Sequence, residues 1–212
     1  MLESHIFYLL IIIAVFTSLI FIRGSKKNKK LSKIISKELE ESINPKITEY
    51  INIGGLIGYH ANYELEDCFY KIKCTFTLLP RHTLVYFPVS LILSKYDRLY
   101  VVIFSKNELK GEAHLIRKNI ANSPHHKIKN TSLQKETYKI SNIVFFIYYQ
   151  NESAKEFIKK CIQGLDMNYI LHISAYPKNK NFYLYMKAVP GNIAVNLKKF
   201  FGIAKTHCSS KS

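Results

Sequence analysis

The sequence predicts an α+β protein: an N-terminal single transmembrane helix, then a mainly antiparallel sheet domain that ends in a β-α-β-β-α segment. Three observations predict this fold. A long uncharged apolar run lies near the N-terminus, alternating apolar and polar residues recur from residue 46 onward, and two amphipathic helical patterns lie in the last third. We therefore divide the chain into an anchor (1–22), a basic juxtamembrane flank with a short helix (23–45) and a cytoplasmic α+β domain (46–212).

The apolar run extends from Ile6 to Ile22 without a charged residue, and Met1 and Leu2 bring it close to the roughly 20 residues that span a bilayer. A cleaved signal peptide is the main alternative. It would begin with positive charge and end at a small-residue cleavage site, whereas Glu3 precedes this run and Arg-Gly-Ser follows it. A buried core helix is the other alternative, but no charged residue gives this run a polar face. The pattern favours a membrane anchor.

The distribution of basic residues predicts the orientation of this anchor. No Lys or Arg precedes the span, and a basic cluster follows it directly. The positive-inside rule then leaves the N-terminus outside and the rest of the chain in the cytoplasm, as in a single-pass protein of the cell membrane. The same residues would lie near anionic lipid head groups, although a simple stop-transfer flank has the same composition. The cluster consists of Arg23, Lys26, Lys27, Lys29 and Lys30.

After the flank, residues 31–42 have the spacing of a short helix that Asn44-Pro45 ends, and we expect it to be a spacer. Alternation over 59–65 and 71–78 predicts an antiparallel hairpin with one wet face. The apolar stretch 84–93 is too short to span a membrane and predicts a buried helix that Pro88 helps to start. Two more strands are expected, over 98–105 and 112–118.

The C-terminal part predicts most of a split β-α-β unit. Its expected elements are a long exposed loop, an apolar central strand, an amphipathic helix that Gly164 ends, a hairpin and a last helix. In order, these elements cover 119–136, 138–150, 153–165, 169–176 with 182–189, and 193 onward.

The four cysteines show neither a C-x-x-C pair nor the spacing of a zinc site. A chain of 212 residues can bury an adequate core without disulfides. We therefore expect reduced cysteines that pack in the interior, as in a cytoplasmic domain, and the sequence gives no reason to expect a metal or a cofactor. The cysteines are Cys68, Cys74, Cys161 and Cys208.

Asp97, Glu108 and Lys110 match the loose Asp…Glu-x-Lys spacing of a large class of metal-dependent nucleases. In those enzymes the Glu and Lys belong to a core strand, so that both point at one metal site. Here they lie in a polar segment that ends in glycine, which predicts a turn. The nuclease interpretation requires these three residues to converge within a few ångströms.

A second possible site combines Glu112 and His114, on one face of a predicted strand, with His125 and His126 in the long loop. Such residues could form a metal or acid–base site. No third ligand is specified, and isolated surface histidines are the favoured interpretation. We therefore predict that the protein is not an enzyme.

The charge points toward a phosphate-rich partner. The chain has 31 Lys and Arg against 15 Asp and Glu, a net charge of +16. Within the domain, the excess is concentrated in 106–139, with eight bases and three acids, and in 151–212, with ten and three. Codon bias in an AT-rich genome is the alternative explanation. The candidate polyanion-binding residues are Lys127, Lys129, Lys155, Lys159, Lys160, Lys198 and Lys199.

Alternation in the last hairpin also places Tyr183, Tyr185 and Lys187 on one face of a strand. Aromatic residues on a basic sheet are used by RNA-binding domains to stack bases. The favoured alternative is that both tyrosines pack against the N-terminal hairpin as part of the core.

These observations predict a membrane-anchored, non-enzymatic adaptor whose basic cytoplasmic domain binds RNA or the ribosome at the membrane surface. An alternative is a scaffold or accessory subunit that contacts another membrane protein through an exposed 84–93 stretch. Burial of Val85, Phe87, Leu91 and Leu93 would count against that alternative. A membrane-tethered nuclease is the third possibility.

Overall fold

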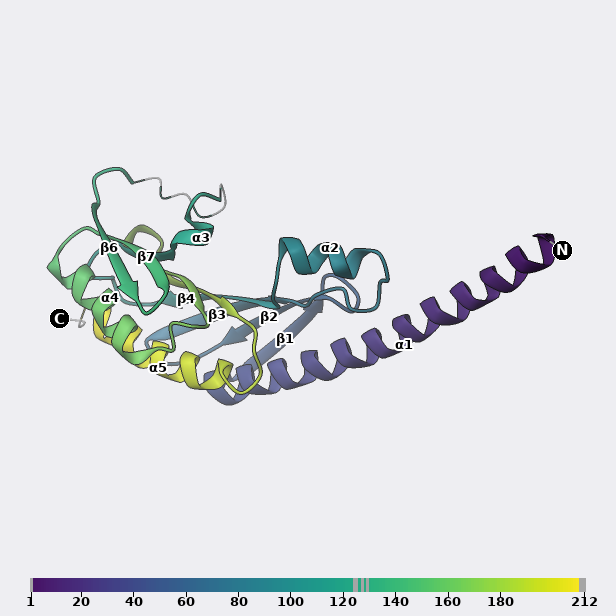
Figure 1. The fold of residues 1–212 in the computed structure, drawn as a ribbon. Helices are drawn as coiled ribbons and strands as arrows, with labels where there is room; N and C mark the ends of the chain where they lie inside the picture. Colours follow the sequence, from purple (N-terminus) through teal and green to yellow (C-terminus); the bar gives the residue numbers. More distant parts are fainter. Residues whose placement is uncertain (1, 124–125, 127, 129, 210–212) are drawn as a thin grey trace.

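The computed structural model describes residues 2–123, 126, 128 and 130–209, and within these residues it confirms the α+β fold (Figure 1). A long helix, α1 (Leu2–Ile43), leads into a nine-stranded sheet in which every neighbouring pair is antiparallel. The strand order is β1-β2-β3-β4-β9-β8-β5-β7-β6. The strands are β1 (Ile47–Asn52), β2 (Gly58–Glu64), β3 (Phe69–Thr77), β4 (Arg98–Ser105), β5 (Ala113–Arg117), β6 (Gln134–Ile140), β7 (Ile143–Tyr149), β8 (Ile170–Tyr176) and β9 (Asn181–Lys187).

The predicted split β-α-β unit is present. Strands β7 and β8 both pair antiparallel with β5, so they run parallel to each other with β5 between them. Helix α4 (Glu152–Gly164) connects them, and β8 continues through a tight turn into β9. Helix α5 (Ile193–His207) follows β9. This arrangement places β9 at the centre of the sheet, between β4 and β8.

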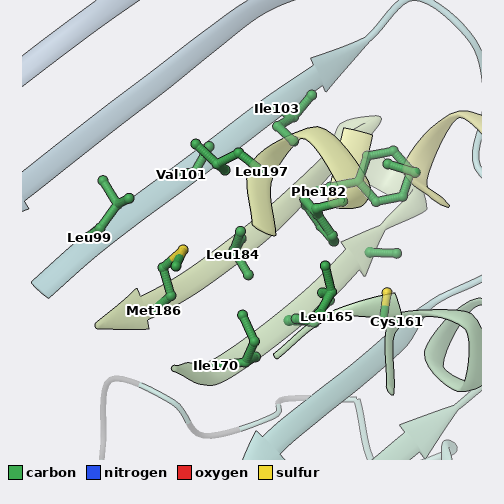
Figure 2. Close-up of a cluster of buried hydrophobic side chains, with 14 of the residues drawn as sticks. Leu99, Val101, Ile103, Cys161, Leu165, Ile170, Phe182, Leu184, Met186 and Leu197 are labelled. Carbon is green, nitrogen blue, oxygen red and sulfur yellow. The ribbon is translucent and has the colours of Figure 1, made fainter. Parts of the chain in front are cut away.

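Helices cover the two faces of the sheet unequally. The C-terminal part of α1 lies with α4 and α5 on one face, which we call the helix-covered face (Figure 1). Two short helices, α2 (Tyr86–Leu93) and α3 (Lys118–Ala121), lie on the other, which we call the open face. Alternation along the strands directs the apolar side chains toward the long helices, and Figure 2 shows this core. Its central members include Leu99, Val101, Ile103, Phe182 and Leu184.

Helix α4 follows its sequence pattern closely. The side chain of Asn151 accepts a hydrogen bond from the backbone N–H of Ala154 and caps the helix. Ala154, Phe157, Ile158 and Cys161 are buried against the sheet, while the lysines lie on the outer side. All four cysteines are free, and burial raises the pKa of the Cys161 thiol above its ordinary value.

The helix expected over residues 31–42 is not a separate spacer, because α1 continues without a break from the apolar run to Ile43. Ile35 and Leu39 are fully buried in the domain core. The Glu38 carboxylate accepts hydrogen bonds from the backbone N–H groups of Gly191 (2.6 Å) and Ile193 (3.2 Å), where it caps α5. The end of α1 is therefore part of the domain.

Two other elements differ from the sequence prediction. The segment 138–150 is not one strand: Ser141, with a φ of 51°, turns the chain between β6 and β7. Helix α2 forms as predicted, but its apolar side chains are not buried. Val85, Ile92 and Leu93 are 78%, 76% and 73% exposed. The sequence pattern predicted the helix but could not predict whether another element of the fold buries its side chains.

Candidate functional site

The first half of α1 meets the requirements of a membrane span in length and composition. Its most apolar 18-residue window has a mean hydropathy of 2.6 and no buried residue. Most of its large side chains from Ile6 to Ile22 are about half exposed or more in the isolated chain. One N-terminal helix could thus cross a membrane.

The base of this span is docked tightly on the domain. Gly24 lies so close to the loop before α2 that a Cβ atom there would overlap with the carbonyl of Arg81. One turn later, the buried Asn28 amide donates to the carbonyl of Leu79 (2.9 Å) and its oxygen accepts from the Arg81 guanidinium (3.1 Å). Arg81 in turn makes a bidentate pair with Asp97, with N–O distances of 2.9 and 2.7 Å. The helix and the loop form one hydrogen-bonded unit.

This docking overturns the nuclease interpretation. Asp97 is held by Arg81 directly before β4, whereas Glu108 and Lys110 follow the other end of that strand. Eight residues at about 3.3 Å each separate the two ends by about 26 Å. Glu108 lies 3.4 Å from the ammonium of Lys180, and Lys110 donates to the Thr206 carbonyl. The three residues do not converge on a metal.

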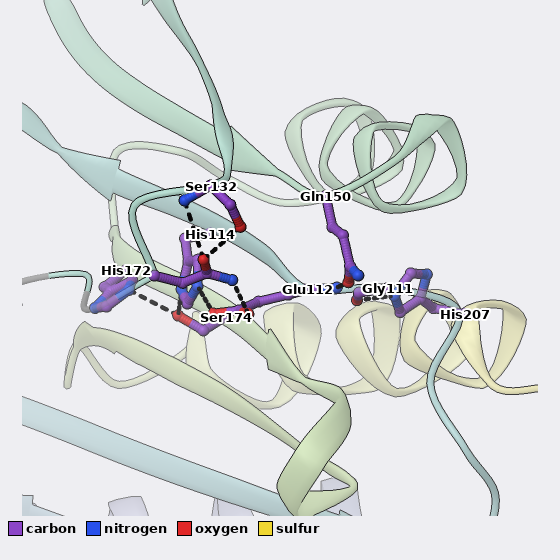
Figure 3. A network of polar contacts seen from close by, with 9 residues as sticks. Gly111, Glu112, His114, Ser132, Gln150, His172, Ser174 and His207 are labelled. Carbon is purple, nitrogen blue, oxygen red and sulfur yellow. Dashed lines mark hydrogen bonds and ion pairs between the residues drawn. The ribbon is translucent and has the colours of Figure 1, made fainter.

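A polar network joins β5 and β8, and Figure 3 shows it. Nε2 of His114 lies 3.0 Å from the Glu112 carboxylate, and Nδ1 lies 2.8 Å from the Ser174 hydroxyl. That hydroxyl lies 2.7 Å from Nε2 of His172, whose Nδ1 lies 3.2 Å from Nδ1 of His126. The interpretation as an isolated surface histidine was wrong for His114, which is buried and hydrogen-bonded. His125 lies outside the described residues.

Burial decides what this network can do. Burial lowers the pKa of His114, although the nearby Glu112 carboxylate opposes this shift. For His172, burial and the charges of His114 and His126 all lower the pKa, which lies well below its ordinary value. Ser174 is fully buried, so a substrate cannot reach its hydroxyl. Among the described residues there is no group of three or more His, Cys, Asp or Glu side chains that could hold a metal ion. The network has the properties of a satisfied internal hydrogen-bond chain.

Beside the network, the open face forms a cleft of about 720 Å³ between the C-terminal end of α2 and α3. Its floor is aromatic. The rings of Tyr100 and Tyr185 are stacked with centroids 4.5 Å apart, and the His126 ring is stacked on Tyr185 at 5.4 Å. Tyr183 lies at the same floor and contacts His172 edge to face. Tyr185 is buried, as the favoured sequence interpretation expected, but it packs against Tyr100 and His126 and not against the β2–β3 hairpin. Tyr183 is only partly buried.

Basic groups surround the aromatic floor. In the register of β4 and β9, Arg98 lies opposite Lys187. Arg98 donates a hydrogen bond to the Ser94 hydroxyl (2.9 Å), and the Lys187 ammonium lies over the Tyr96 ring, 5.5 Å from its centroid. Burial and the nearby charge of Arg117 lower the pKa of Lys187, against the opposing charge of Asp166. Lys95 adds an exposed ammonium at the end of α2, and among the described lining residues there is no Asp or Glu. The cleft therefore combines the partly exposed rings of Tyr100 and Tyr183 with the positive charge of Lys95 and Arg98.

The lysines expected to bind a polyanion lie elsewhere. Lys155 is 2.6 Å from Glu136, which together with Tyr149 raises the pKa of Lys155 to about 12. Lys160 lies 3.7 Å from Glu156. Among the described residues, Lys159, Lys198 and Lys199 are exposed and have no ion pair, on the outer side of the helix-covered face. Lys127 and Lys129 lie outside the described residues. The basic flank residues, Arg23, Lys26, Lys27, Lys29 and Lys30, are exposed on α1 below the apolar run.

Sequence reasoning missed the cleft, although part of its signal was present. Arg98 and Tyr100 alternate on β4 as Tyr183, Tyr185 and Lys187 do on β9, and the strand pairing superimposes the two patterns. No protein-family model matches the chain, and no curated protein matches it in sequence.

Proposed function

We propose that the protein is a single-pass membrane protein whose basic cytoplasmic domain binds RNA, foremost that of the ribosome, and acts as a non-enzymatic adaptor at the membrane surface. The observation that carries the proposal is the cleft itself, in which Lys95 and Arg98 lie beside the rings of Tyr100 and Tyr183 with no Asp or Glu among the described lining residues. A phosphate would find cationic partners there, and a base would find a partly exposed aromatic ring beside them. RNA supplies both groups in every nucleotide.

The anchor and the charge distribution support the same proposal. The exposed lysines of α4 and α5 and the flank of α1 would add long-range attraction to a polyanion, and the excess of bases over acids in the domain favours a partner of opposite charge. The five bases directly after the apolar run place the domain in the cytoplasm in this proposal.

The test is co-sedimentation of the full-length protein, in lipid nanodiscs, with ribosomes from its own source at about 50 and about 200 mM salt. Three double variants each change the net charge by −4. Lys95→Glu/Lys187→Glu alters the cleft, Lys198→Glu/Lys199→Glu alters α5, and Lys135→Glu/Lys139→Glu alters exposed positions of the edge strand β6 as a matched control.

We expect saturable binding that weakens steeply at the higher salt concentration. The cleft variant should bind about tenfold more weakly, the α5 variant several-fold more weakly, and the control within about twofold of the wild type. Equal losses in all three variants would mean that only net charge matters and would refute the cleft. Absence of binding at low salt would refute the adaptor and leave codon bias as the explanation of the charge.

A second candidate function is an accessory subunit that contacts another membrane protein. The exposure of α2 favours it, because burial would have counted against it. Leu91 is 42% exposed, in addition to Val85 and Leu93, and Phe87 is only partly buried. Photocrosslinking from position 92 in native membranes tests this candidate: a discrete protein adduct supports it, and lipid adducts alone contradict it.

A further inference from the structure

The segment from residue 83 to residue 94, which includes α2, contains no charged side chain. Within α2 only Ser90 is buried, although the helix consists almost entirely of apolar and aromatic residues. A soluble domain rarely leaves such a patch uncovered. The position of this segment relative to α1 indicates what covers it.

The loop that leads into α2 lies against the last part of the apolar run of α1. The two segments form the walls of a groove of about 720 Å³, with Thr17, Phe21 and Ile22 on one side and Leu84 and Val85 on the other. At its base the ring of Phe21 contacts His82 edge to face, with centroids 5.8 Å apart. The exposed apolar surface of α2 is therefore continuous with that of the span.

The depth of this contact can be derived from the helix itself. The uncharged run from Ser4 to Ile22 has 19 residues and is about 28 Å long, close to the roughly 30 Å hydrocarbon thickness of a bilayer. If this run spans the bilayer, Thr17 to Ile22 occupy about the last 7 Å of hydrocarbon on the domain side. The side chains that touch these residues lie at the same depth. Interfacial helices are buried by a similar amount, about 5–10 Å.

The positions of nearby basic residues agree with this depth in the membrane. Arg23, Lys26 and Lys27 are exposed on α1 immediately beyond the apolar run, at the level of the lipid head groups. Lys95 is exposed directly after α2. Basic residues at the ends of an apolar segment suit an anionic membrane surface. The docking of Gly24 and Asn28 on the loop before α2 holds the two segments at a common level.

We propose that residues 83–86, the loop before α2 and its first residue, insert into the cytoplasmic leaflet beside α1, so that the protein holds the membrane at two adjacent segments. The other end of α2 faces the cleft, where Leu93 is a lining residue. This inference rests on the membrane anchoring in the proposed function, but not on RNA binding. It assigns to lipid part of the surface that the second candidate function would assign to a protein partner.

The chain contains no tryptophan, so a single introduced Trp is a unique fluorescent reporter. The experiment uses four full-length variants in vesicles of phosphatidylcholine and phosphatidylserine, without any other protein. Val85→Trp and Tyr86→Trp test the segment at exposed positions. Phe16→Trp reports on the span, and Tyr138→Trp is the aqueous control, 45% exposed on β6. Quenching is measured with lipids that carry bromine or a nitroxide on the acyl chain, and circular dichroism verifies the fold.

Insertion predicts that Val85→Trp and Tyr86→Trp show blue-shifted emission and a quenching constant within about twofold of that of Phe16→Trp, at least fivefold above that of Tyr138→Trp. If Phe16→Trp is quenched but both reporters of the segment behave like Tyr138→Trp, the insertion is overturned and the anchor is not. The exposed surface would then be reassigned to a protein partner. An unquenched Phe16→Trp would overturn the anchor and the insertion together. Ribosome binding is measured separately, so it can fail without affecting these outcomes.

Discussion

Phe182 and Tyr183 are consecutive residues of β9, yet they belong to different environments because side chains alternate along a strand. Phe182 is fully buried on the helix-covered face, in contact with Phe157 and Phe200. Tyr183 lies at the floor of the cleft on the open face. The helix-covered face satisfies its side chains internally, whereas the cleft on the open face has partly exposed aromatic rings and cations, with no Asp or Glu among its described lining residues. The first face stabilises the fold, and the second is the one to which our proposal assigns binding.

The largest expected effect comes from truncating these two neighbours. Phe182→Ala should lower the free energy of unfolding by about 3–5 kcal/mol, because it leaves a cavity between the sheet and two helices. Tyr183→Ala should cost less than about half of this and should instead weaken ribosome binding. Urea denaturation in detergent, followed by circular dichroism, measures the first effect, and co-sedimentation measures the second. Equal destabilisation by both variants would contradict the division between the faces.

The second effect concerns the junction between α1 and the open face. Asn28→Ala should lower the stability by about 1–3 kcal/mol, because it removes a buried donor and leaves the Leu79 carbonyl without this partner. The loss should be local, with faster proteolysis in the segment 79–93. Limited proteolysis followed by mass spectrometry can detect it. Ser42→Ala, near the other end of α1, is the control and should leave the cleavage pattern unchanged.

The third effect is a dependence of the stability on pH, which we expect from the buried histidines of β5 and β8. His114 and His172 have lowered pKa values, so the folded state binds fewer protons than the unfolded state. Their contribution is complete above the unfolded pKa of about 6.5 and is lost as the pH falls below it. The free energy of unfolding should therefore be lower at pH 5 than at pH 7.5.

Melting temperatures recorded between pH 7.5 and pH 5 test this prediction. His172→Gln should melt at a lower temperature at pH 7.5, since Ser174 loses its buried partner, but its decrease toward pH 5 should be shallower than that of the wild type. Identical slopes would show that other groups cause the acid sensitivity.

The smallest effect is expected at the cap of α5 on the helix-covered face. Glu38→Gln removes the negative charge at the helix N-terminus and keeps one oxygen, which can accept either the Gly191 or the Ile193 N–H group but not both as the two carboxylate oxygens do. It should lower the stability by about 0.5–1 kcal/mol, and the loss should shrink at high salt. Glu41→Gln, whose carboxylate lies on the exposed side of the same helix, should change the stability by less.

The sequence pattern predicted burial correctly where it depends on alternation along one strand or on the apolar face of one helix. The alternation of Ala61 and Tyr63 on β2 and the unbroken face of α4 are examples. The turn at Ser141 was missed because it contains neither Gly nor Pro, and a serine with positive φ has no strong sequence signal. The continuity of α1 was missed because Gly24 and Ser25 indicate a break, whereas the structure uses their small size for close packing.

The site was less predictable than the fold for a physical reason. Lysine counts located charge along the chain, but they could not show that Lys155 is paired with Glu136 while Arg98 faces another cation. Both facts depend on which strands are neighbours. Strand β9 pairs with β4, about 80 residues earlier in the sequence, and that pairing creates the cleft.

The continuity of α1 has a consequence for rotation. An α-helix turns by about 100° and rises 1.5 Å with each residue, so the span and the domain share one fixed angular phase. One residue inserted after Ile22 would rotate the span by that angle relative to the Gly24 contact, and the lipid-facing side of the span would no longer match the side on which α2 lies. In the proposed arrangement, a partner meets the cleft at one height and one azimuth above the bilayer. Recognition would therefore depend on where the partner is held relative to the membrane as well as on its chemistry.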